Sequence, residues 1–332
     1  MKKVEIYQVV NNFERYRNVD SICLLNNNVE NPLFSIIIPT YKRIDTLIFS
    51  LKSAIHQEEF DNYEIVIVNN STEGTNDEVY DIVTSLNSDR LSYYVNSKNI
   101  GLCGNWNRAI ELSRGKYIVM LHDDDLLSPY CLRSLYDVVL KYKEPGIIGV
   151  DYYKFNSKDI PKFEKPINLK CFNITKIGYF LGRNINIAGM TFKKDLAIEI
   201  GGFNDNYYPN EDTIFIYQAL LRSKVVNIKQ KLAGYRVELN ATLTGDTLQQ
   251  IILLTEETRR SIATRNIFAD YWMKCFELEY FYEYVTEANK HWNTNLSFDK
   301  LCELVKLDDK KISKFKYKLM FIIKKILLKI LC

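Results

Sequence analysis

The chain has 332 residues, 47% of them hydrophobic and 26% charged, which fits an ordinary globular protein with one large domain plus an extension, or two domains. Its seven cysteines are scattered without a C-x-x-C pair, so neither a zinc ribbon nor a disulfide framework is indicated, and a reduced cytosolic interior is expected. The net charge of +3 is uneven, because residues 310–332 carry eight lysines and no acid, which argues against the broad basic surface of a nucleic-acid-binding fold.

Short apolar strands alternate with helical patterns in the first part of the chain. Strands are predicted at 34–39, 63–68, 91–95 and 116–121, and helices near 47–55, 77–86 and 103–113. This order indicates βαβ units and a mainly parallel sheet, in which ligands bind beyond the carboxyl ends of the strands. It therefore predicts a nucleotide-binding half at 34–125.

The remaining segments are less regular. Ser128-Pro129 would start a helix, after which 126–240 reads as a mixed second half of the same domain. Residues 241–309 are predicted to be helical, because 246–300 contain helix formers and aromatics without Gly or Pro. Residues 1–33 form an extension without a readable motif or a signal-peptide-like apolar stretch, and either pack on the domain or contact another chain.

Two acidic clusters are candidates for chemistry. Asp123, Asp124 and Asp125 follow a predicted strand, and their mutual repulsion would be relieved by a hard divalent cation such as Mg²⁺ or Mn²⁺. Equally, the run could favour the N-terminus of the next helix. Glu211 and Asp212 precede an apolar helix, where they could be N-terminal charges or supply a carboxylate that deprotonates a hydroxyl.

Other catalytic classes lack their motifs. The chain has no G-x-G-x-x-G, no P-loop and no G-x-S-x-G elbow, which disfavours dinucleotide sites, P-loop sites and hydrolase triads. Only three histidines are present, dispersed at 56, 122 and 291, so a histidine-based zinc site is not expected.

Ordered segments across the chain carry a family resemblance. They are residues 34–43, 68–75, 99–110 and 115–129, followed by Gly201-Gly202-Phe203 and Glu211-Asp212. In sequence and spacing they resemble the family 2 inverting glycosyltransferases of the bacterial polysaccharide type, which have the glycosyltransferase-A fold. The resemblance covers about 34–240 and implies a Rossmann-like α/β domain with a mainly parallel sheet flanked by helices, its acceptor half at 126–240, and a helical C-terminal extension.

The resemblance also implies roles for individual residues. The nucleotide-sugar site would be lined by Pro39, Thr40, Tyr41, Arg43, Asn69, Asn70, Asn99, Asn107, Asp123 and Asp124. Asp124 would be the principal ligand of Mn²⁺ or Mg²⁺, with Asp125 or Asp123 beside it, since the register of the run is open. Asp212 would be the catalytic base, with Glu211 as its neighbour.

Three positions depart from the family pattern. Asn69 and Asn70 stand where aspartates commonly contact the base and ribose. Trp106 replaces an arginine before Asn107, and residues 235–238 lack a histidine that many members carry.

The implied activity is inverting transfer of a sugar from a nucleotide-diphosphate sugar, expected to be a UDP-sugar, to a hydroxyl of a glycan or lipid-linked glycan in cell-surface polysaccharide synthesis. The alternative is a catalytically degenerate nucleotide-binding partner subunit of a glycosyltransferase complex. A homo-oligomer is compatible with either, and no nucleic-acid partner is expected.

The basic tail points to a membrane surface. Lysines at 311, 314, 318, 325 and 329 recur at helical intervals, and apolar residues at 312, 315, 319, 322, 323, 326 and 330 fall largely on the other side. Such a helix lies in the interface of an anionic membrane, and the alternative is a helix packed on the protein body. We therefore expect residues 310–332 to hold a cytoplasmic protein on the inner face of the cell membrane.

Overall fold

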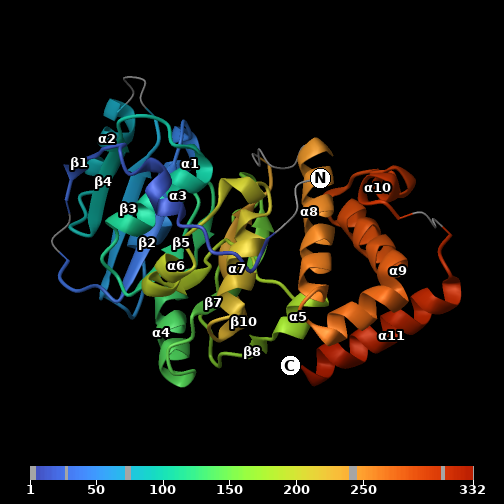
Figure 1. Ribbon diagram of the computed structural model, residues 1–332. Helices are drawn as coiled ribbons and strands as arrows, with labels where there is room; N and C mark the ends of the chain where they lie inside the picture. The colour runs from blue at the N-terminus through green and yellow to red at the C-terminus, as the bar shows by residue number, and fades with distance from the viewer. Residues whose placement is uncertain (1–4, 27–28, 72–75, 239–244, 308–310, 332) are drawn as a thin grey trace.

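The computed structural model describes residues 5–26, 29–71, 76–238, 245–307 and 311–331. An α/β body carries a group of helices on one side, built from the C-terminal part of the chain (Figure 1). The predicted class, a mainly parallel sheet flanked by helices with a helical C-terminal extension, is confirmed.

One sheet runs through the body. In the described residues its strand order is β1-β4-β3-β2-β5-β9-β7-β10-β6, with β8 also paired to β10. The strands are β1 (Ser21–Leu25), β2 (Phe34–Thr40), β3 (Tyr63–Asn69), β4 (Leu91–Asn96), β5 (Tyr117–Met120), β6 (Leu126–Leu127), β7 (Ile147–Phe155), β8 (Cys171–Ile174), β9 (Thr191–Lys193) and β10 (Val225–Arg236). Strands β4, β3, β2 and β5 are parallel, whereas β9 runs antiparallel between β5 and β7.

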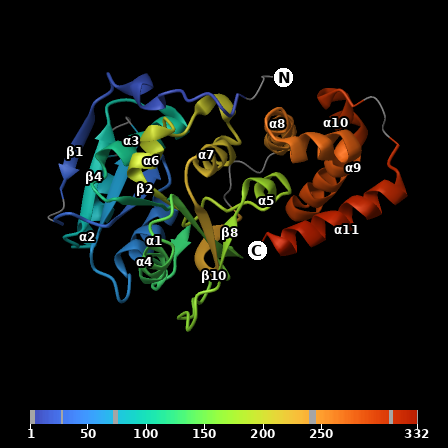
Figure 2. The ribbon, with the colours of Figure 1, turned by 60° about the horizontal axis from the view of Figure 1, so that its bottom comes forward.

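Helices cover both faces of this sheet (Figure 2). The helices of the body are η1 (Asn12–Tyr16), α1 (Ile44–Ile55), α2 (Asn76–Ser85), α3 (Gly101–Leu112), α4 (Cys131–Lys141), α5 (Lys176–Phe180), α6 (Lys194–Glu199), η2 (Asp205–Tyr207) and α7 (Glu211–Leu220). Helices α1, α2 and α4 bury apolar side chains against one face, and α3, α6 and α7 against the other. Strands β2 and β3 are therefore buried on both faces, in keeping with their mainly apolar sequences.

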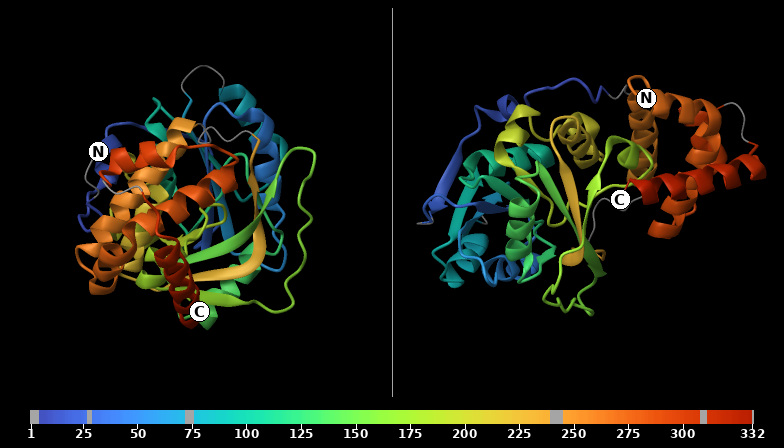
Figure 3. Two further views of the ribbon diagram at one scale, coloured as in Figure 1. Left: turned by 90° about the vertical axis from the view of Figure 1, so that its right-hand side faces the viewer. Right: turned by 90° about the horizontal axis from the view of Figure 1, so that it is seen from below.

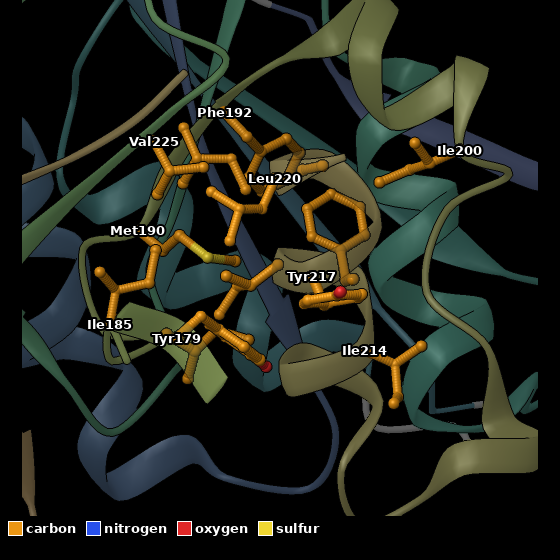
Figure 4. Packing of buried hydrophobic residues seen from close by; sticks show 14 of the residues in the cluster. Tyr179, Ile185, Met190, Phe192, Ile200, Ile214, Tyr217, Leu220 and Val225 are labelled. Carbon is orange, nitrogen blue, oxygen red and sulfur yellow. The ribbon is translucent and has the colours of Figure 1, made fainter. Parts of the chain in front are cut away.

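The core on the α7 face is rich in aromatic residues. Ile214, Tyr217 and Leu220 of α7 pack with Met190 and Phe192 in one buried cluster (Figure 4). Burying each such side chain contributes about 1.5–3 kcal/mol. This packing fixes the position of α7, and so of the acidic residues at its N-terminus.

The N-terminal extension packs on the body. Strand β1 pairs antiparallel with β4 at the edge of the sheet. The buried guanidinium of Arg108 on α3 donates to the carbonyls of Val19 and Tyr16, at 2.7 and 2.9 Å. Of the two alternatives for this segment, the described residues thus show packing on the domain.

The C-terminal helices are α8 (Gly245–Ala263), α9 (Ile267–Trp292), α10 (Phe298–Val305) and α11 (Lys314–Ile330). Helix α8 packs on α9, and α11 also packs on α9, with its C-terminal end toward the body (Figure 3). There Arg183 donates to the carbonyl of Leu328 at 2.9 Å. The predicted helical character of 241–309 and of the tail is confirmed for the described parts of both segments. Residues 241–244, 308–310 and 332 lie outside the described residues, as do 72–75 of the second motif. Among described helices, none combines the length and apolarity needed to span a bilayer.

Candidate active site

A cavity of about 750 Å³ opens where the parallel strands end. Because Thr40 of β2 pairs with Asn69 of β3 at their last residues, the loops after both strands meet at one edge of the sheet. The acidic run follows β5 at the same edge, and the N-terminus of α7 approaches it from the other half of the domain. Helices α8 and α9 line the remaining side.

The β2–α1 loop forms one wall. Pro39, Thr40, Tyr41 and Arg43 all line the cavity, as the sequence predicted for them. The ring of Tyr41 is 45% exposed, which leaves a flat aromatic surface available to a ligand.

Asn70 and Asn99 also line the cavity, and they brace each other. The Asn70 side chain donates to Asn99 Oδ1 at 2.9 Å and to the Gly101 carbonyl at 3.1 Å. Its own oxygen accepts from the backbone of Ile100 at 3.0 Å. These bonds fix the loop that leads into α3. Asn70 therefore lines the cavity itself and also holds this loop in place at the cavity.

Asn69 and Asn107 are not among the lining residues. Asn69 donates to the Tyr93 hydroxyl at 2.9 Å and accepts from the backbone of Ser71. The Asn107 amide donates to the carbonyl of Phe203 and accepts from its N–H, both at 2.8 Å. Asn107 thus ties α3 to the turn before α7. That turn needs glycine at 201, where φ is +81° and an added Cβ would sit 2.0 Å from the Val10 carbonyl.

Two members of the acidic run line the cavity. Asp123 accepts from the Thr40 hydroxyl at 2.8 Å, and Arg43 forms an ion pair with Asp124 while lying 3.5 Å from Asp123. Burial raises the pKa of Asp123 to about 6, and the neighbouring charge of Asp124 adds to this.

Asp125 is not among the residues that line the cavity. Its side chain accepts from the backbone N–H of Arg236 at 3.0 Å and lies 3.2 Å from His122 Nδ1. The His122 ring stacks on Trp106 with centroids 5.4 Å apart, and its Nε2 has no hydrogen-bond partner. Burial lowers the pKa of His122, but the bond to Asp125 and the other aspartates outweigh this and raise it. Trp106, in place of the family's arginine, therefore packs on this imidazole.

The donor atoms around the run fit a divalent cation. His122, Asp124 and Asp125 each offer a ligand atom, and these atoms lie within 4.8 Å of one another. The unpartnered His122 Nε2 and the carboxylates that line the cavity are a donor set of the kind Mn²⁺ accepts. Asp124 is the member of this set that both faces the cavity and lies in the run.

Glu211 and Asp212 occupy the first turn of α7, and both line the cavity. Asp212 Oδ1 accepts from the Thr213 N–H at 2.6 Å, and Glu211 has one carboxylate oxygen that is buried without a partner. Burial raises the pKa of Glu211 to about 8, with the charge of Asp212 adding to it, and burial also raises the pKa of Asp212. Both carboxyl groups of this pair thus bind a proton more readily than exposed carboxyl groups do.

Residues of the helical extension complete the cavity, which the sequence did not predict. One face of α8 contributes Ile251, Thr255, Thr258, Arg259 and Ile262, and α9 contributes Tyr284 and Trp292. The spacing of the α8 residues is that of one helical face, but such a face is equally typical of packing on a core. Asn210 donates to Thr255 Oγ1 at 2.9 Å, which couples α8 to the N-terminus of α7.

Comparison with known proteins identifies the family. The model of the family described as "Glycosyl transferase family 2" matches residues 35–198, which include β2 to β9 and the acidic run. The chain belongs to glycosyl transferase family 2.

Two bacterial relatives are named as glucosyltransferases. The chain is 28% identical over 220 residues to the GalNAc(5)-diNAcBac-PP-undecaprenol beta-1,3-glucosyltransferase of Campylobacter jejuni, a match that covers 62% of this chain and 65% of the relative. It is 33% identical over 93 residues to the UDP-Glc:alpha-D-GlcNAc-diphosphoundecaprenol beta-1,3-glucosyltransferase WfaP of Escherichia coli, covering 28% and 36%. The chain thus spans less than two thirds of the length of either relative.

The glycosyltransferase fold also appears among solved structures. The structure of S. aureus TarS 1-349 in complex with UDP-GlcNAc superposes with a TM-score of 0.56 over 86% of this chain and 79% of that one, at 14% identity. This likeness concerns the fold, and with the family match it confirms the glycosyltransferase-A-like class expected from the sequence.

Proposed function

We propose that the protein transfers a sugar from a nucleotide-diphosphate sugar to a hydroxyl of a glycan or lipid-linked glycan, with inversion at the anomeric carbon. The observation that carries this proposal is the shared cavity, which joins the β2–α1 loop, Asp124 and Asp212 from separate elements. The names of the relatives support it, because the Campylobacter relative is a glucosyltransferase named for an undecaprenol-diphosphate-linked acceptor.

The donor would bind on the side of the β2–α1 loop. Tyr41 offers a ring face to the base, and the TarS complex with UDP-GlcNAc supports a uridine nucleotide for this fold. Asp124, with His122 and with Asp125 or Asp123, would hold Mn²⁺ or Mg²⁺. When bound, such an ion supplies positive charge that stabilises the departing diphosphate.

Arg43 lies beside Asp124, at the proposed metal site. In the structure its guanidinium neutralises Asp124, and with a donor bound it would be free to contact a phosphate oxygen.

The acceptor would enter on the side of α7. Asp212 would take the proton of the attacking hydroxyl while the oxygen bonds to the anomeric carbon and the bond to the diphosphate breaks. Burial raises the pKa of Asp212 above its ordinary value, which makes the carboxylate a stronger base. Glu211 lies beside it and, when protonated, could donate a hydrogen bond to the acceptor.

A panel of nucleotide sugars tests this proposal. UDP-, dTDP- and GDP-sugars are offered with Mn²⁺ or Mg²⁺, and thermal stabilisation and nucleotide release are measured. A ligand present at about 100 times its Kd adds about 2.7 kcal/mol of stability. We expect a UDP-sugar to stabilise the protein and to be slowly hydrolysed. Stabilisation without hydrolysis or transfer would favour the non-catalytic partner subunit, and no response to any donor would contradict the proposal.

The membrane proposal concerns α11, whose apolar residues divide between two faces. Met320 is buried, and Ile323, Leu327 and Leu328 pack toward the body. The residues that remain exposed form a row at helical spacing: Phe315, Leu319, Ile322, Ile326 and Ile330, at 76%, 40%, 56%, 52% and 73%. Exposed lysines accompany this row, at 314, 316, 318, 325 and 329. One face of α11 therefore packs on the protein body, as one of the two alternatives from the sequence expected. The other face is exposed and remains available for a membrane surface.

An exposed apolar row with lysines and no acid fits the interface of an anionic bilayer. We propose that α11 places the enzyme on the inner face of the cell membrane, where a lipid-linked acceptor would be found.

Vesicle binding tests the role of this row. The Ile322→Ser/Ile326→Ser variant is expected to bind vesicles of anionic phospholipid at least tenfold more weakly, since each buried isoleucine contributes about 1.5–3 kcal/mol. Binding is measured by co-sedimentation. The control is Ile267→Ser, at an equally apolar position that is 91% exposed at the start of α9. Equal binding by wild type and the α11 variant would contradict the proposal.

A further inference from the structure

The α8–α9 side of the cavity holds a buried cation that the catalytic scheme above does not use. Arg259 is 6% exposed, lines the cavity, and is sandwiched between aromatic rings, 4.0 Å from the Tyr280 centroid and 4.4 Å from that of Tyr284. Its Nη1 forms an ion pair with Glu256 Oε2 at 3.6 Å but donates no hydrogen bond. Buried guanidinium N–H groups are normally hydrogen-bonded, so a lining arginine that keeps an N–H without an acceptor is a candidate for binding an anionic ligand.

The position of Arg259 indicates that it would contact the acceptor rather than the donor. It lies one turn along α8 from Thr255, which binds Asn210 at the start of α7 and the Tyr284 hydroxyl at 3.1 Å. Arg259 is therefore on the side of Asp212, whereas the predicted donor residues belong to β2, β3 and α3. The anion that reaches it would be attached to the molecule that presents its hydroxyl to Asp212.

The same end of the cavity adjoins α11. Gly182, a lining residue, is so placed that an added Cβ would lie 3.9 Å from Lys324 Nζ. Lys324 pairs with Glu283 at 2.7 Å, and its Nζ lies 5.0 Å from the ring centroid of Tyr280. A ligand that entered from a surface covered by α11 would thus meet Lys324 first and Arg259 deeper in the cavity.

We propose that Arg259 binds a phosphate of the acceptor, and that the acceptor is a saccharide carried on a lipid diphosphate. The planar guanidinium, held by two aromatic rings, presents N–H groups that suit a phosphate. This inference rests on the proposed function, because it assigns an acceptor class to the same cavity. It extends that function by giving the C-terminal helices a part in substrate recognition.

Farnesyl diphosphate is a suitable probe, because it has the lipid diphosphate without the saccharide. Its binding to the full chain is measured by isothermal titration with UDP already saturating the donor site. Arg259→Gln is expected to weaken it by about tenfold to a hundredfold, the range for a hydrogen bond to a charged group. UDP affinity is expected to stay unchanged. Farnesol, which lacks the diphosphate, is expected to bind wild type and variant equally weakly.

Matched variants separate recognition from packing. Arg260→Gln removes the neighbouring arginine, which bonds to Glu277 and the Val305 carbonyl and is not a lining residue, and should leave the affinity unchanged. Arg259→Lys keeps the charge beside Glu256 but loses the planar donor pair, and should give an intermediate affinity even if Arg259→Gln proves unstable.

Several outcomes would overturn the inference: no binding of farnesyl diphosphate to wild type, equal loss in the Arg259 and Arg260 variants, or a loss confined to UDP, which would assign Arg259 to the donor. Absence of UDP binding to the wild type would instead count against the proposed function.

Discussion

Asp212→Asn should reduce sugar transfer or donor hydrolysis by about 10²- to 10⁴-fold, the usual contribution of a positioned general base. The amide retains the size of the side chain and can still accept from the Thr213 N–H, but it cannot take the proton of a hydroxyl. Released nucleotide is measured with the donor found in the panel. Donor affinity should remain near that of the wild type, because Asp212 would act on the acceptor.

The control for this variant is Asp205→Asn. Asp205 lies in η2, shortly before α7, where it pairs with Arg15 at 2.9 Å and is not a lining residue. Its substitution should leave activity unchanged. An equal loss of donor affinity in Asp212→Asn would place Asp212 in the donor site, and full activity would remove it as the base.

Asp124→Asn should lower activity by on the order of 10²-fold or more, because a metal that stabilises a leaving group contributes several kcal/mol. The affinity for UDP in the presence of Mn²⁺ should fall with it, since the proposed metal joins the protein to the diphosphate. Titration of UDP with and without Mn²⁺ measures this. Excess chelator should reduce the wild type to the level of the variant.

Asp137→Asn provides the matched control. Asp137 lies on α4 and pairs with Arg133 one turn away. Its substitution should change neither the activity nor the affinity for UDP. Transfer that persists at the wild-type rate in excess chelator would rule out the metal role of Asp124. A loss of folding in Asp124→Asn, seen as an early thermal transition, would show that its pair with Arg43 is structural.

The positions of the strands along the chain could be predicted from the sequence because each strand of the first half is a short, mainly apolar run. The predicted strand at 34–39 is observed as Phe34–Thr40, and that at 63–68 as Tyr63–Asn69. Burial on both faces imposes this pattern locally, so no distant residue is needed to read it. The family could be recognised for the same reason, since its motifs lie in the loops that directly follow these strands.

The helical tail was predictable in part. The periodicity of lysines and apolar residues predicted a helix, which α11 confirms, but not that Met320 and Leu327 would pack on the protein while Ile322 and Ile326 stay exposed. A broad apolar side looks the same in sequence whether it is covered by lipid or by α9. Only the position of α9 decides which apolar residues of α11 are packed and which are exposed.

The roles within the acidic run could not be read from spacing. Asp124 and Asp125 are neighbours of identical chemistry, yet one lines the cavity and the other accepts from the backbone of Arg236, which is 111 residues away. Asn107 is a similar case, because its partner Phe203 is 96 residues away. A polar side chain turns toward whichever partner satisfies its hydrogen bonds, and these partners come from other elements.

By itself, then, the sequence predicted the succession of strands and helices in the first half, the family resemblance, and the two acidic clusters as candidate sites. The tertiary structure alone decided that Asp124 rather than Asp125 faces the cavity, and that Arg259 enters it from α8. Local periodicity encodes burial within one element, whereas the composition of a cavity depends on how separate elements pack. The proposed metal site is thus centred on Asp124 and its neighbours, opposite a cavity wall that the helical extension supplies.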